Sequence, residues 1–419
     1  MVQGAEASRK WTVAVWIAGD NDLQSFGTTD LDEMKKVGSS DDVAVVAQFD
    51  RMGDEQTRRY FLRRDTSLDS DVVEELGETD TGDPAVATDF FTWAFTEWPS
   101  EKVLAVIWNH GSGIDETDIY ARATTRGLRV ERRADGGNGD AVPRARVREV
   151  ASSGLRRAVF ATTLEKAVNS RAIAYDDTSR DFLDNAELKR VLNDVVRNTD
   201  RPIDVLGFDA CLMNLVEVAY QLRGTVNYIV GSEEVEPGDG WPYDAVVGEL
   251  AASPDIAPGE AAASFVEKYM ESYRGDESVT QSAVDVSRVS AVAEATSDLA
   301  TKCLPLLEST QDFGEFSKAV KNAQRFRMKD FADLGDFARR LGESSPSADV
   351  KEASTRVAES LFGDSPFVLA SAQKGSGVEG STGVAVYFPL VGDVHVAYDG
   401  LDFGADTQWG QLITKYGEA

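Results

Sequence analysis

The chain is poor in the residues that build covalent cross-links and zinc sites. Its 419 residues include only two cysteines and two histidines. Two cysteines cannot form a disulfide framework, and a zinc site with four nitrogen or sulfur ligands would use every Cys and His in the chain. Disulfide-stabilised scaffolds and typical structural zinc proteins are therefore excluded.

Long apolar runs and an excess of positive charge are also missing. No run of 18 or more apolar residues occurs, which predicts no membrane-spanning helix. The polar start, residues 1–10, lacks the apolar centre of a secretory leader, although secretion stays open if a leader has been trimmed. The 72 acidic residues outnumber the 43 basic ones, and the net charge of −29 argues against nucleic acid or an anionic membrane as a partner. Acidic residues spread along the whole chain favour a salt-loving source, the alternative being an ordinary acidic protein.

Apolar strand-like runs alternate with amphipathic helix-like stretches through the first half of the chain. Such alternation predicts an α/β fold with a mostly parallel central sheet and helices on both faces. The second half is more helical and adds three further strands. We therefore expect a core over residues 1–250 and an appended α/β portion over residues 251–419, packed on that core.

One segment interrupts the pattern. Residues 115–175 carry 11 arginines and one lysine against eight acidic residues, a local charge of +4 in an otherwise acidic chain. A connection of this length is usually functional or disordered. Two interpretations remain open: a basic arm that docks on the acidic body, or a loop that the protein cuts in itself.

His110 and Cys211 each follow a predicted strand directly. A thiol nucleophile needs a base beside it, and histidine is the usual one. Because functional residues of parallel sheets gather beyond the carboxyl ends of strands, we expect the two side chains to meet. The alternative for Cys211 is an inert core cysteine.

Neighbouring residues strengthen the catalytic interpretation. Gly111 allows a substrate carbonyl to approach the backbone, and the amides of Gly111 and Cys211 are candidates for an oxyanion hole. Cys211 is also expected to begin a helix over residues 212–222, whose N-terminal dipole would lower the pKa of the thiol.

Several stretches of the sequence, including those around His110 and Cys211, resemble a known family. Trp108–Gly113 and Phe208–Met213 are similar to the His and Cys blocks of the clostripain family, cysteine peptidases of clan CD related to caspases, legumain and gingipains. Five further stretches also resemble that family: 11–34, 174–179, 236–241, 333–337 and 383–389.

The resemblance implies a caspase-like three-layer sandwich and a Cys–His dyad that needs no cofactor for its chemistry. It implies cleavage of protein or peptide substrates after basic residues. It also implies a proenzyme, expected to be monomeric, that cuts itself between the dyad residues and becomes two chains. The Arg-rich segment lies at that place, and Arg122, Arg126 and Arg129 are the nearest candidates for the cut.

A pocket for arginine needs a carboxylate, because a buried guanidinium must be paired. Asp209 is the first candidate, since clan CD relatives line this pocket with the equivalent residue. Asp239 is the second, and Glu233 and Glu234 are further alternatives.

Calcium is a further candidate ligand. Asp176, Asp177 and Asp181, together with Asp184, crowd a short loop, and hard cations favour such oxygen clusters. The resemblance adds that clostripain-like enzymes can depend on calcium. The alternative is a plain capped helix.

A second function from another class also fits the sequence. The chain could be a catalytically silent caspase-like scaffold whose basic insertion binds an acidic partner. The presence of both dyad residues disfavours this alternative.

Overall fold

The computed structural model describes residues 9–21, 23–53, 56–109, 111, 172–176, 181–274, 277–390, 394, 398 and 400–419. Within the hairpin that precedes Leu183, it describes the backbone and not the side chains. The Arg-rich segment up to residue 171 lies outside these ranges, and so do His110 and the proposed cut residues.

A nine-stranded sheet forms the centre of the molecule, in the order β12-β10-β9-β8-β5-β1-β2-β3-β4. The five strands from β9 to β2 run parallel, and the pairs at both edges are antiparallel. The strands are β1 (Arg9–Gly19), β2 (Val43–Arg51), β3 (Gln56–Phe61), β4 (Val72–Gly77), β5 (Ser100–Trp108), β8 (Ile203–Asp209), β9 (Val226–Gly231), β10 (Val279–Asp285) and β12 (Val368–Lys374). The predicted mostly parallel sheet is confirmed.

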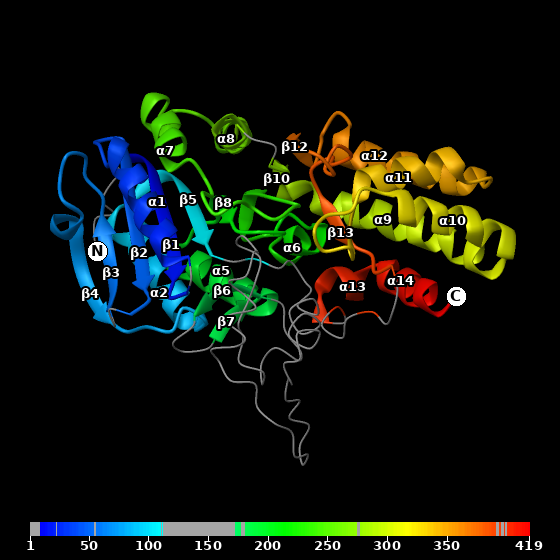
Figure 1. Cartoon of the computed structure of the whole chain (residues 1–419), viewed down its shortest axis with the longest axis horizontal. Coiled ribbons are helices and arrows are strands. Elements are labelled where there is room, and N and C mark those ends of the chain that lie inside the picture. The colour runs from blue at the N-terminus through cyan, green and yellow to red at the C-terminus, as the bar shows by residue number, and fades with distance from the viewer. Residues whose placement is uncertain are drawn as a thin grey trace, which may run out of the picture.

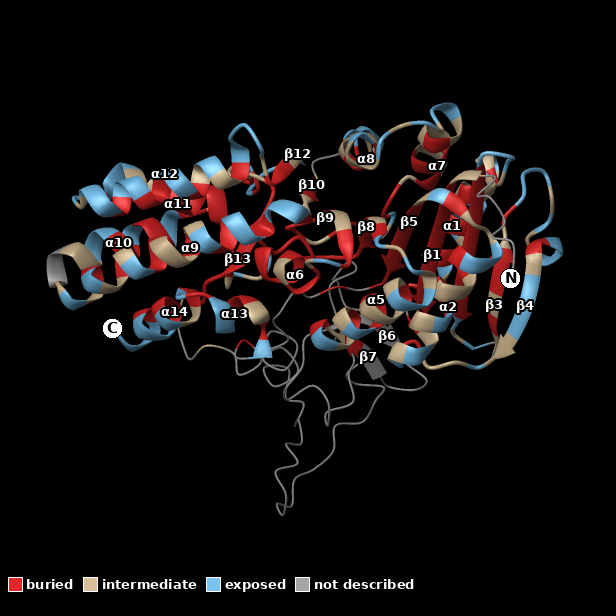
Figure 2. Ribbon diagram, turned by 180° about the vertical axis from the view of Figure 1, so that it is seen from behind, coloured by how far each residue is buried: buried red, intermediate tan, exposed pale blue. Residues whose placement is uncertain are grey.

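Helices cover both faces of this sheet (Figure 1). One apolar cluster contains residues of α1, α7 and α8, and the other contains residues of α2, α5 and α6. Side chains of β1 alternate between the two clusters, with Trp16 in one and Val15 and Ile17 in the other. These helices are α1 (Gln24–Val37), α2 (Pro84–Glu97), α5 (Asn185–Thr199), α6 (Val216–Gln221), α7 (Tyr243–Ala252) and α8 (Pro258–Ser272). The parallel strands are therefore buried on both sides, as Figure 2 shows by colour.

The C-terminal portion extends this sheet. Its strands β10 and β12 pair beside β9, and its helices α9, α10, α11 and α12 pack against one another beyond that edge (Figure 1). The remaining elements are α9 (Val289–Cys303), α10 (Thr310–Asn322), α11 (Leu334–Ser344), α12 (Ala348–Phe362), α13 (Asp402–Asp406), α14 (Trp409–Glu418) and the short strand pairs β6 (Ala172–Asp176) with β7 (Asp181–Asp184) and β11 (Phe331–Asp333) with β13 (Ala385–Tyr387). A division of the chain at residue 250 remains a prediction.

Local signals account for several boundaries. Pro84 stands at the start of α2, where its missing N–H costs nothing, and Asp83 caps the same helix by accepting Ala85 N–H. Helix α11 begins at Leu334, because the residues before it, 331–333, pair with β13. Among the described residues, no helix combines the length and apolar character needed to cross a membrane.

Candidate active site

The strands before His110 and Cys211 are neighbours in the sheet. Trp108, at the end of β5, lies opposite Asp209, at the end of β8, and Asn109 N–H donates to Asp209 O at 3.3 Å. The two sequence blocks therefore meet at one edge, as the strand pattern predicts. His110 itself lies outside the described residues.

Gly111 continues this contact on the far side of position 110. A Cβ placed on Gly111 would lie 2.3 Å from Cys211 O and 3.0 Å from Cys211 N. Real Cβ atoms do not approach backbone atoms this closely, so only glycine fits here. Both neighbours of His110 thus touch the segment that carries the cysteine.

Cys211 is fully buried, and polar backbone groups contact its sulfur. Glu236 N–H donates to Sγ at 3.1 Å, and Sγ lies 3.9 Å from Glu236 O. Leu212 N–H donates to Glu234 O, and Asn214 N–H donates to Ser232 O. An N–H donor directed at sulfur stabilises negative charge on it.

The expected helix over residues 212–222 is wrong at its start. Helix α6 begins at Val216 and has six residues, so its dipole does not act on the thiol. Leu212 instead has φ of +62°, a left-handed conformation that costs a non-glycine residue roughly 1–2 kcal/mol. The chain turns sharply after Cys211 because the following residues bond to segment 232–234 and not to a helix.

Asn109 ties the end of β5 to the end of β1. Its amide donates to Ala18 O at 2.6 Å, and its Oδ1 accepts Asn21 Nδ2 at 3.4 Å. Asn21 also donates to Ala18 O and accepts Leu23 N–H. Asn109 therefore fixes the end of β5, directly before His110, to the end of β1.

The first predicted pocket acid, Asp209, is fully buried beside the cysteine segment. Tyr243 Oη donates to Asp209 Oδ2 at 2.9 Å. The pKa of the buried Tyr269 hydroxyl is raised well above its usual value, first by burial and then by neighbouring charges that include Glu236 and Asp209. Two buried acids of the site, Glu236 and Asp209, therefore act on one buried tyrosine.

The other acids are placed differently. Asp239 is exposed on a turn in which Gly240 N–H donates to Pro237 O. Glu233 accepts Gly383 N–H, and Glu234 accepts Arg327 N–H, so both carboxyls are engaged by backbone groups.

Sequence reasoning missed Glu236 and Tyr243 as partners of the site. Glu236 lies in the block 236–241, which resembles the family, and that block was the available signal. Nothing in the local sequence marks Tyr243 as the donor to Asp209, because the contact forms only when α7 packs on the sheet.

The described residues contain no cluster of three or more acidic, His or Cys side chains that could bind calcium. Asp177 lies outside them, and Asp176 and Asp181 have described backbones only, facing each other across the β6–β7 hairpin. Asp184 accepts Glu187 N–H and caps α5 through a capping box, which is the plain role foreseen for it.

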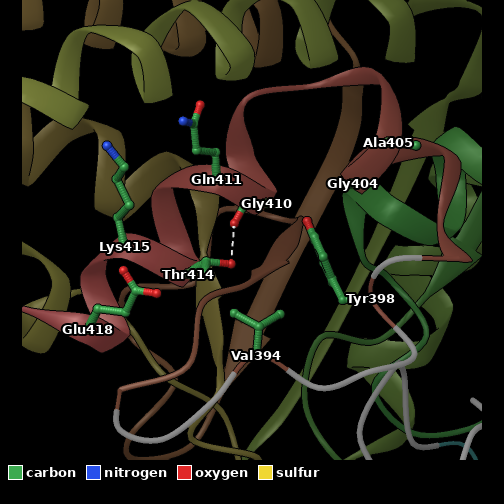
Figure 3. Close-up of a pocket in the computed structure, with 9 residues that line it drawn as sticks. All are labelled: Val394, Tyr398, Gly404, Ala405, Gly410, Gln411, Thr414, Lys415 and Glu418. Carbon is green, nitrogen blue, oxygen red and sulfur yellow. Dashed lines mark hydrogen bonds between the residues drawn. The ribbon is translucent and has the colours of Figure 1, made fainter.

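A separate surface hollow of about 480 Å³ lies between α13 and α14 (Figure 3). Tyr398, Gln411 and Lys415 are among its lining residues, and Thr414 Oγ1 donates to Gly410 O within it. None of the residues of the Cys211 site lines this hollow.

Comparisons with known proteins agree with this geometry. The model of the clostripain family, peptidase family C11, matches residues 15–131 and 161–416 and leaves part of the Arg-rich segment unmatched. Clostripain from Hathewaya histolytica is 24% identical over an alignment 272 residues long, which covers 58% of this chain and 43% of clostripain. The matched span is thus less than half the length of that relative.

Two solved structures share the fold over nearly their whole length. A secreted C11 cysteine protease from Bacteroides thetaiotaomicron, in complex with an irreversible peptide inhibitor, is 20% identical with a TM-score of 0.61 and covers 97% of this chain and 99% of its own. An inactive zymogen C11 protease from Parabacteroides distasonis is 18% identical with a TM-score of 0.62 and covers 96% and 99%. The family model and the fold together show that this chain belongs to the clostripain family of cysteine peptidases.

Proposed function

We propose that this protein is a cysteine endopeptidase that cleaves after arginine or lysine, with Cys211 as nucleophile and His110 as general acid and base. The observation that carries the proposal is the contact of Asn109 and Gly111 with residues 209 and 211 at the joined ends of β5 and β8. Family membership supports the same pair of residues, since both lie in the matched range.

The proposed reaction proceeds through a thioester. His110 takes the proton of the Cys211 thiol, and the sulfur attacks the scissile carbonyl carbon while the carbonyl oxygen gains negative charge. The amides of Gly111 and Cys211 would stabilise that oxygen. His110 then protonates the leaving amine, and a water, deprotonated by His110, hydrolyses the thioester and regenerates the thiol.

Buried acidic residues near Cys211 support the proposed cleavage after arginine or lysine. Asp209 is fully buried and accepts a hydrogen bond from Tyr243, and Glu236, whose backbone N–H donates to the sulfur, is a second buried acid. A guanidinium or ammonium group that enters this region would form an ion pair with a carboxylate rather than stay without a counter-charge. Asp239, exposed on the turn after Glu236, is proposed to contact the same substrate side chain from the rim.

The proposal includes a proenzyme. The Cys211 sulfur is buried in the uncut chain, which fits an inactive precursor. Cleavage at Arg122, Arg126 or Arg129 would open the chain between the two catalytic residues and give a two-chain, monomeric enzyme. Calcium bound at Asp176, Asp177 and Asp181, and a salt-loving source, remain further predictions.

Labelling with an arginyl acyloxymethyl ketone tests this function. After self-cleavage the reagent should modify Cys211 and spare Cys303, whose buried thiol has a raised pKa. An aspartyl ketone of the same length and a C303A variant are the matched controls. Failure to label Cys211 at low and high salt, with calcium supplied, would favour the silent scaffold instead.

A further inference from the structure

Three chain segments lie side by side next to the proposed nucleophile. Segment 232–236, which follows β9, accepts the N–H groups of Leu212 and Asn214. On the opposite side, Ala385 N–H donates to Asn214 O at 3.0 Å, and Asn214 Nδ2 donates to Gly383 O at 3.2 Å. The cysteine segment is thus held between two strips of chain, which are segment 232–236 and residues 383–385.

Two acidic side chains, Glu233 and Asp333, join these strips to the start of α11. Both are buried, and their carboxyl groups lie close enough to repel each other when both are charged and to form a hydrogen bond when one carries a proton. Glu233 Oε2 accepts Gly383 N–H at 3.2 Å. Asp333 accepts the N–H of Asp336 at 2.7 Å, and the N–H and O–H of Thr382 at 2.6 and 2.7 Å.

Such a contact needs one proton, because two buried carboxylates side by side repel each other. Asp333 already accepts three donors, which suits the charged partner. Glu233 Oε1 accepts no hydrogen bond from the described residues, which suits the oxygen that carries the proton. Burial, and then the charge of Asp333, raises the pKa of Glu233 well above its usual value, while burial raises the pKa of Asp333 to about 6.

We propose that Glu233 acts as a protonated positioning residue, whose carboxylic acid donates to Asp333 and thereby fixes segment 232–236 against Cys211. The connection is short, since Glu236 in that segment donates its N–H to Sγ. Loss of the proton would place two negative charges between the strips and release the segment. As a statement about catalysis, this inference rests on the proposed peptidase function.

Among the residues that the structure describes, the other groups around the pair do not supply a counter-charge to Glu233. Glu234, on the same segment, adds negative charge that favours protonation. Asp336 of α11 is ion-paired with Arg339 and Arg340, and those cations are thereby engaged. Arg327 and Lys329 lie near the Glu234 carboxylate and lower its pKa against the larger effect of burial. Strand β10 presents the neutral groups Thr280 and Ser282.

The sign of the pH dependence follows from the raised pKa of Glu233. The folded chain keeps a proton that the unfolded chain loses above about pH 4.5, so this contribution to stability is full below that pH. It declines as the pH rises toward the folded pKa and is gone above it.

The test compares full-length E233Q, E233A and E234Q with the unchanged protein over a range of pH. In E233Q the amide still donates to Asp333 and accepts Gly383 N–H, but it cannot ionise. We expect the melting temperature of E233Q to increase relative to that of the unchanged protein as the pH rises. E233A should melt lower at every pH, and E234Q should move the decline to lower pH, because it removes a negative charge that favours the proton on Glu233.

Peptide hydrolysis gives the second readout. On the alkaline side, kcat/KM of the unchanged protein should fall about tenfold per pH unit as Glu233 ionises, and E233Q should lose that limb of the profile. A melting-temperature difference between E233Q and the unchanged protein that is constant with pH overturns the inference. If instead the difference grows with pH while no variant hydrolyses arginyl peptides, the proton on Glu233 stands and the peptidase proposal fails.

Discussion

The two cysteines occupy contrasting surroundings, although both are fully buried. Cys303 ends α9 among apolar side chains, and burial alone raises the pKa of its thiol. Cys211 stands at a strand end, receives Glu236 N–H on its sulfur and lies two residues after the buried Asp209. Burial therefore does not separate a structural thiol from the proposed nucleophile. Oriented polar groups at the end of the parallel strands make the difference.

Removing each sulfur in turn should give the largest contrast. C211A should abolish hydrolysis of arginyl peptides, by on the order of 10⁴-fold or more, and should remain one uncut polypeptide on a denaturing gel. C303A should keep its activity and lose about 1 kcal/mol of stability, because it only leaves a small cavity. Fragmentation of C211A at arginines within residues 115–175 would show that another agent makes the cut.

Adding one methyl group at two glycines should sharpen the same contrast. G111A would force a Cβ against the backbone of Cys211, so we expect a loss of kcat/KM of about 100-fold or more. G314A is the control, because Gly314 is exposed within α10 and nothing lies within 4 Å of its added Cβ. That variant should raise the free energy of unfolding by up to about 1 kcal/mol. Equal activities of the two variants would contradict the close contact at Cys211.

Neutralising the buried acid beside Cys211 should have a smaller effect. D209N should lower kcat/KM for an arginyl peptide by about 100-fold, since a bound guanidinium would lose its paired charge at a cost of about 3 kcal/mol. Y243F, which removes the donor to Asp209, should cost about fivefold, or roughly 1 kcal/mol. Alkylation of Cys211 by a small neutral haloacetamide should stay unchanged in both variants of the cleaved protein. A D209N enzyme with full activity on arginyl peptides would move the specificity to Glu236 or Asp239.

Much of the architecture follows from patterns of residues that are close in sequence. The runs at residues 11–18, 43–49, 103–108 and 203–208 are mostly apolar, with Thr12, Gln48 and Asp204 as the exceptions, because parallel strands are covered on both faces, and each run forms a strand of the observed sheet. The place of Cys211 at the end of β8 was predictable for the same reason. The helix expected immediately after it was not, because Leu212–Leu215 bond to segment 232–234 and to β13, which are distant in sequence.

The sequence by itself determined the strands, the two residues most suited to thiol catalysis and the family. Those properties depend on periodicity and on the rarity of Cys and His, and both can be read locally. Only the tertiary structure decided that Glu236 donates to the sulfur, that Tyr243 holds Asp209, and that Glu233 and Asp333 are buried together. Each of these pairs joins groups from different elements, and the energy of such a contact depends on a burial that exists only after the sheet and its helices have packed together.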